Sequence, residues 1–168
     1  MEQLRELLIE ELRDIYHAEG QLIKALPKMA KAARSPQLKK SFENHLAETQ
    51  SQIQRLQQMF ELLGEKVKGK PCKGMAGLVE EGQEVIKDGK RKDETMADLA
   101  LIGAAQRVEH YEISAYGTAR AIAERIGESR VVRLLAQTLK EEENADSTLT
   151  KVAQPLLEEA AKPKIEQD

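Results

Sequence analysis

The stretch VEHYEISAYGT, residues 108–118, sets the first constraint on the fold. Glu109 and Glu112 are three residues apart, so a helix places both carboxylates on one face. Tyr116 follows one turn after Glu112. The other residues of that face are apolar, namely Ile102, Ala105, Ile113, Ala119 and Ala123. A helix with acids among such residues requires partner helices that bring matching groups to the same depth.

The composition is that of an all-α protein. Of 168 residues, 33% are charged and only 3% are aromatic, and helix-forming residues dominate. The net charge of −3, with both signs interspersed, argues against a nucleic-acid partner. No apolar run reaches the roughly 20 residues of a membrane span. The lone Cys72 and the acidic N-terminus, which does not resemble an export signal, favour a cytoplasmic location.

Helical periodicity predicts four long helices, at about 4–33, 36–63, 94–126 and 129–160. Ser35 and Pro36 are suited to begin the second helix, and we expect a bend or a broken turn at Pro27. Residues 64–77 are predicted to be a loop, and residues 78–89 a short helix. Two short links separated by one long crossover are typical of a ferritin-like four-helix bundle. We expect one such domain over 1–161 and a disordered tail over 162–168.

Several acids and one histidine point inward when each is placed against the apolar stripe of its helix. At about 1.5 Å of rise per residue, the carboxylates from all four helices lie roughly 20–27 Å from their hairpin turns. His45 lies about a turn shallower, near 15 Å. The candidate metal ligands are Glu19, His45, Glu48, Glu109, Glu112, Glu142 and Asp146.

This many carboxylates cannot share a dry core as anions, because each buried unpaired charge costs several kcal/mol. Protonation, inward-pointing basic residues or bound cations could each solve this problem. Only Arg107 and Arg120 lie near these stripes, so divalent cations are the favoured interpretation. Carboxylate and imidazole ligands together suit iron or manganese.

The chain also resembles a known family, the YciE/YciF bacterial stress proteins, over about residues 7–152. The resemblance is carried by DIYHAEGQL (14–22), HLAETQSQI (45–53), GLVEEGQEVI (77–86), AAQRVEHYEISAYGT (104–118) and TLKEEENAD (138–146). It implies a ferritin-like bundle, commonly dimeric, with a carboxylate-rich di-iron-type centre and a link to stress responses.

One departure from the general ferritin pattern concerns the histidines. A Glu-x-x-His pair is absent, because Ser51 follows Glu48 and Ala145 follows Glu142 at the third position. The second helix instead has the reverse order, His45-x-x-Glu48. A site held almost entirely by carboxylates makes manganese a serious alternative to iron.

Two functional hypotheses follow. The first is a metal-binding stress protein with two iron ions, in which peroxide- or O₂-linked redox activity requires an external electron donor. In this reading Glu19, Glu48, Glu112 and Glu142 are the main ligands, while Glu109 and Asp146 add further oxygens. The second is a structural or partner-binding helical stress protein whose metal site is not catalytic. Under either hypothesis the resemblance points to a homodimer.

Overall fold

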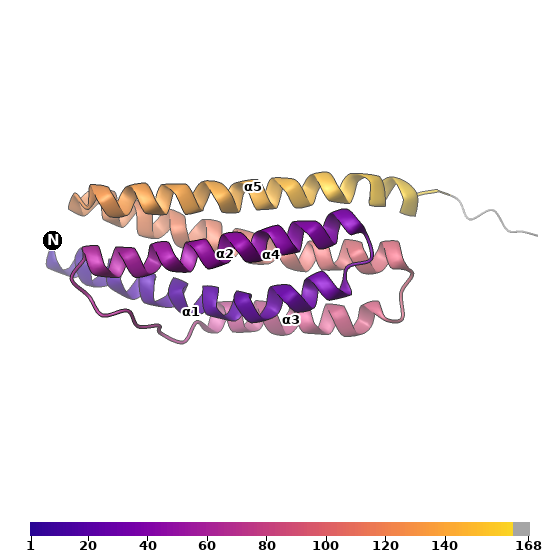
Figure 1. The fold of residues 1–168 in the computed structure, drawn as a ribbon, viewed down its shortest axis with the longest axis horizontal. Helices are drawn as coiled ribbons and strands as arrows, with labels where there is room; N and C mark the ends of the chain where they lie inside the picture. The colour runs from indigo at the N-terminus through magenta and orange to yellow at the C-terminus, as the bar shows by residue number, and fades with distance from the viewer. Residues whose placement is uncertain (163–168) are drawn as a thin grey trace, which may run out of the picture.

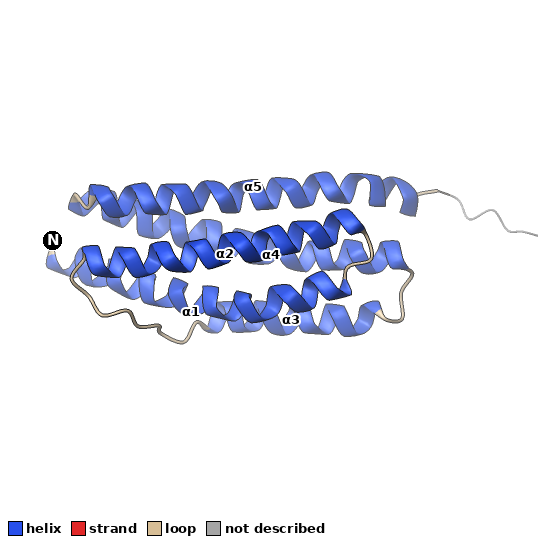
Figure 2. Cartoon of the chain, viewed as in Figure 1, coloured by secondary structure: helices blue, strands red, loops and turns tan. Residues whose placement is uncertain are grey.

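The computed structural model describes residues 1–162, which form five helices and no strands (Figure 2). The helices are α1 (Glu2–Ala32), α2 (Pro36–Leu62), α3 (Lys73–Gly89), α4 (Glu94–Ile126) and α5 (Ser129–Ala160). The four long helices lie side by side as two hairpins, α1–α2 and α4–α5, and α3 lies in the crossover (Figure 1). The predicted all-α bundle is confirmed. The predicted tail falls almost wholly on residues 163–168, which lie outside the described part of the chain.

The helix boundaries follow local signals that the sequence shows. Ser35 caps α2, with its Oγ accepting from the backbone N–H of Leu38 at 3.4 Å, and Pro36 is its first residue. Gly127 ends α4 with φ +83°, in the left-handed region that favours glycine. The helix α1 continues through Pro27, an exposed residue, so the predicted broken turn does not occur.

The predicted loop over residues 64–77 is too long at its C-terminal end, because α3 begins at Lys73. The Sγ atom of Cys72 accepts from the backbone N–H of Met75 at 3.4 Å and so caps the helix. Gly74 sits against the ring of Tyr111, where an added Cβ would lie 2.7 Å from Cε2. Here glycine allows two helices to approach closely, rather than breaking a helix.

The apolar core is divided into two clusters along the bundle. One cluster includes Leu22 and Phe42, and the other includes Leu12 and Leu56. Every long helix contributes to both clusters, and buried polar residues lie between the two contributions on α2, α4 and α5 and at their boundary on α1. These buried polar residues are Glu19, His45, Thr49, Gln52, Glu109, Glu112, Thr138 and Glu142. The fold therefore holds a polar layer across the middle of its core.

A buried acid on α4 anchors the turn between α1 and α2. The carboxylate of Asp98, 1% exposed, accepts from the backbone N–H groups of Arg34 at 2.8 Å and Ser35 at 2.6 Å. These two donors lie in the turn just before α2. This contact ties the first hairpin to the second.

Replacing Asp98 by alanine should lower the free energy of unfolding by about 2 kcal/mol, because hydrogen bonds to a charged acceptor are lost and two donors are left unpaired. Urea unfolding measures the effect, with the exposed Asp88→Ala as the matched control. Equal midpoints for the two variants would contradict this role.

Two glycines of α3 should respond in opposite ways to alanine. Nothing lies within 4 Å of a Cβ added at Gly77, so Gly77→Ala should stabilise the exposed helix surface by about 0.5–1 kcal/mol. Gly74→Ala should not stabilise the protein, because the added methyl group would displace the Tyr111 ring. Thermal unfolding of both variants tests this, and a stabilised Gly74→Ala would contradict the close packing.

Candidate metal centre

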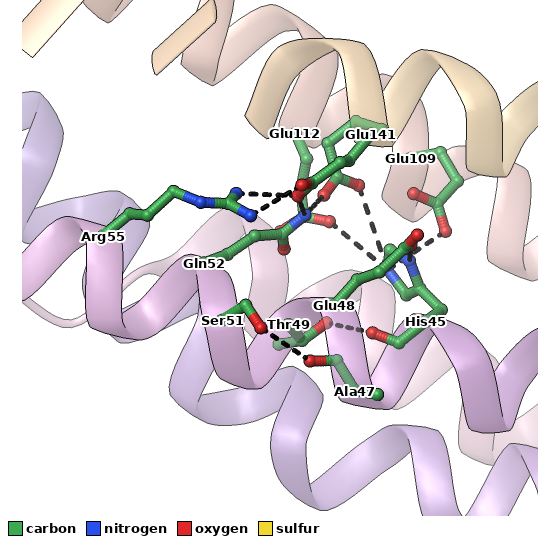
Figure 3. Close-up of polar contacts among 11 residues, drawn as sticks. His45, Ala47, Glu48, Thr49, Ser51, Gln52, Arg55, Glu109, Glu112 and Glu141 are labelled. Atoms are coloured by element: carbon green, nitrogen blue, oxygen red, sulfur yellow. Dashed lines mark hydrogen bonds and ion pairs between the residues drawn. The ribbon is translucent and has the colours of Figure 1, made fainter. Parts of the chain in front are cut away.

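Four side chains of the polar layer converge on one point. His45 from α2, Glu109 and Glu112 from α4, and Glu142 from α5 each offer one ligand atom, and these atoms all lie within 4.8 Å of one another. The Nε2 atom of His45 is 3.4 Å from Oε1 of Glu109 and 3.9 Å from carboxylate oxygens of both Glu112 and Glu142. Figure 3 shows His45 facing Glu109 and Glu112.

The local sequence explains this convergence. Glu109 and Glu112 occupy successive turns of one face of α4, while His45 replaces an apolar residue in the inward row of α2. All four side chains are at most 6% exposed. The helices pack in two antiparallel pairs, which brings residues far apart in the sequence to one level of the bundle.

Many polar atoms in this layer have no hydrogen-bond partner within residues 1–162. They include both carboxylate oxygens of Glu112, both ring nitrogens of His45, and one oxygen each of Glu19, Glu109 and Glu142. Buried polar atoms are ordinarily satisfied, and a cluster of unpaired ones calls for an explanation. Carboxylate oxygens and imidazole nitrogens at this spacing are suitable ligands for a divalent iron or manganese ion.

Glu19 lies in the same layer but outside the group of four. It is fully buried on α1, and the phenol of Tyr116 donates to its Oε1 at 2.5 Å. Its Oε2 has no partner. Tyr116 is therefore more than apolar packing, because it orients the one carboxylate that α1 supplies.

Sequence reasoning did not assign a site role to Gln52, Arg55 or Glu141. The Nε2 of Gln52 donates to Oε1 of Glu142, and it also donates to Glu141 at 3.2 Å. The guanidinium of Arg55 holds Glu141 through two hydrogen bonds, of 2.7 and 2.6 Å (Figure 3). The available signal was the position of Gln52 in the inward row of α2, seven residues after His45.

Two predicted ligands lie away from the four-residue cluster. The side chain of Glu48 is 44% exposed, and its Oε2 is 3.7 Å from Nδ1 of His45, on the outer side of the ring. Asp146 is half-buried between α4 and α5, where Gln106 donates to it at 3.1 Å and the ring of His110 lies 3.3 Å away. The structure thus brings together Glu109, Glu112, Glu142 and His45, with Glu19 in the same buried layer, Glu48 at the edge and Asp146 outside.

The buried acids perturb one another's protonation. Burial and the negative charge of Glu142 raise the pKa of Glu19 to about 8. Burial is also the main reason why the pKa values of Glu109 and Glu112 lie well above their usual range. Burial by itself lowers the pKa of His45, but the charge of Glu109 and the interactions with Glu48 and Glu142 outweigh it and raise this pKa to about 10. Without a cation, the cluster therefore retains protons.

Comparison with known proteins places the chain in a family. Residues 3–162 match the family model described as "Domain of unknown function (DUF892)". The curated protein YciF of Escherichia coli strain K12 is 42% identical over 154 residues, which are 91% of this chain and 92% of that protein. The chain belongs to this family. The resemblance to the YciE/YciF proteins is thereby confirmed.

Solved structures of relatives agree with the fold. The crystal structure of the E. coli stress protein YciF superposes with a TM-score of 0.87 at 41% identity, covering 94% of this chain and 99% of that one. The structure of YcfI from Rhodopseudomonas palustris, described as a proposed structural protein, gives a TM-score of 0.85 at 45% identity, covering 89% and 94%. Within residues 1–162, no helix combines the length and the apolar character needed to cross a membrane.

The metal-free protein should lose stability as the pH rises. Glu19 keeps its proton up to about pH 8 in the folded state, whereas the unfolded chain loses it near 4.5, so the folded state binds more protons across this window. The free energy of unfolding then falls as the pH rises from 4.5 to about 8. His45 contributes in the same direction from 6.5 to about 10.

Thermal unfolding of chelator-treated protein at about pH 5.5 and about pH 8.5 measures this slope. The Glu19→Gln variant should show a shallower decline, because its amide does not titrate. A wild-type midpoint that increases over the interval would contradict the assignment of raised pKa values.

Proposed function

We propose that this chain is a metal-binding stress protein whose buried carboxylates and histidine hold a dinuclear iron centre, with manganese as the alternative metal. The observation that supports it is the convergence of four ligand-type side chains, with unpaired atoms, at one point of the core. The relation to E. coli YciF, which is described as a stress protein, supports the physiological setting.

Five buried side chains would hold the ions. His45, Glu109, Glu112 and Glu142 would be ligands, because their ligand atoms lie within 4.8 Å of one another. Glu19 would add a further ligand, because its free Oε2 lies in the same layer and its pKa responds to the charge of Glu142. The amide of Gln52 would fix the orientation of Glu142 through the hydrogen bond that it donates.

The protein's own groups would set the chemistry of such a centre. When bound, two such ions would supply a two-electron redox couple that can react with O₂ or peroxide. Tyr116 holds Glu19 in place and offers an oxidisable phenol at 0% exposure. The clusters on either side exclude bulk water, which strengthens the electrostatic interactions between ligands and ions. Reduction would require an external donor, and a homodimer remains our expectation for the assembly.

Metal content after anaerobic loading with competing Fe(II) and Mn(II) tests the proposal. The wild type should bind about two ions per chain, and Glu142→Gln should lose most of this metal, because a fully buried ligand of the cluster is removed. Glu143→Gln, an exposed neighbour on the same helix, is the matched control and should bind like the wild type. Glu19→Gln should lose less metal than Glu142→Gln, because Glu19 lies outside the group of four.

A second candidate is a structural role for the bundle, with a metal that only stabilises the fold. The description of the relative YcfI as a proposed structural protein favours it. Stoichiometric metal without consumption of peroxide or O₂ by the reduced protein would support this candidate. No stoichiometric metal in the wild type would contradict the dinuclear centre itself.

A further inference from the structure

A cleft between α2 and α5 leads from the surface to the buried cluster. Its cavity measures about 120 Å³, enough for a few water molecules or a hydrated ion in transit. Asn44 of α2 and Asn144 and Thr148 of α5 line its exposed part. His45 and Glu109, which belong to the cluster, form its inner wall.

The two residues of the inner wall have ligand atoms that no other group uses. Both ring nitrogens of His45 and the Oε2 of Glu109 have no hydrogen-bond partner within residues 1–162. His45 is 5% exposed and Glu109 is 3% exposed. The cleft therefore ends at buried nitrogen and oxygen atoms that can bind a cation.

The opposite side of the bundle is covered by apolar residues. The crossover helix α3 packs against α1 and α4 (Figure 1), and its Leu78, Val79 and Ile86 join the apolar core there. A cation arriving from that side would have to cross packed apolar side chains. The seam between α2 and α5 has no such cover within residues 1–162.

Glu48 stands between solvent and the cluster on the rim of this cleft. Its carboxylate is 44% exposed, yet its Oε2 reaches to 3.7 Å from Nδ1 of His45 (Figure 3). A negative charge at a narrow polar mouth attracts cations and raises their local concentration. An exposed carboxylate can also bind a hydrated ion without the desolvation cost that burial imposes.

We propose that the α2–α5 cleft is the entrance for divalent cations and that Glu48 is a transfer ligand rather than a resident one. Glu48 replaces part of the cation's water shell at the rim, and His45 and Glu109 then displace both Glu48 and the remaining water. This inference rests on the proposed metal centre and adds the path by which it is filled. Ala145 lines the same cleft, so a larger side chain at that position would narrow it.

Co(II) uptake by the full-length metal-free protein tests the path, followed by stopped-flow visible absorption, with final stoichiometry measured by mass spectrometry. Ala145→Leu should slow uptake at least ten-fold without changing the final stoichiometry. Glu48→Gln, which keeps the shape of the side chain, should slow uptake several-fold and weaken its dependence on salt, because the screened attraction is lost. The matched controls are Ala47→Leu and Glu43→Gln, exposed on α2 and outside the cleft.

The outcomes separate this inference from the proposed centre. If the wild type binds Co(II) stoichiometrically but both cleft variants load at the wild-type rate, the entrance is wrong and the centre stands. If Glu48→Gln loses an ion at equilibrium while Glu43→Gln does not, Glu48 is a resident ligand and the transfer role is overturned. If the wild type binds no Co(II), the centre itself fails. Circular dichroism checks that each variant is folded. Glu48→Gln tests the entrance without changing the packing at Ala145.

Discussion

The burial of ionisable groups at one level of the bundle is the constraint on which the rest of the structure depends. Placing a carboxylate in an apolar core without a partner costs several kcal/mol, and neighbouring carboxylates add to that cost. This chain places Glu19, Glu109, Glu112 and Glu142 there, with His45 as the nearest cationic group. The raised pKa values show how the metal-free protein tolerates the layer, by retaining protons.

The two apolar clusters on either side of this layer make it possible. Leu12 and Leu56 represent the packing on one side, and Leu22 and Phe42 the packing on the other. These contacts stabilise the bundle enough to hold unsatisfied polar atoms in a fixed arrangement, which is the preorganisation that a metal site requires. Asp98 adds to this rigidity, because it joins α4 to the turn between α1 and α2.

The hydrogen bonds around the cluster determine which of its carboxylates are free to bind a metal. Arg55 neutralises Glu141, so this acid is removed from the set of free ligands. Gln52 supplies a neutral amide at a depth where another carboxylate would add repulsion. Tyr116 orients Glu19 through its hydroxyl group. The result is an asymmetric layer, with free ligand atoms gathered on the α2–α4–α5 side and the α1 carboxylate held separately.

The sequence by itself determined the four long helices, the crossover and the inward direction of His45, Glu109 and Glu112, because periodicity and capping are local properties of the chain. It also indicated the shared depth of the acids, since helix rise is constant. Only the tertiary structure decided that Glu48 lies at the rim and Asp146 outside, because the rotation of a helix about its axis is set by packing against its neighbours. Periodicity gives only an approximate direction for a residue next to the apolar face of its helix. Packing against the neighbouring helices then decides whether a carboxylate there reaches the cluster, lies at the rim of the cleft or faces away from the cluster.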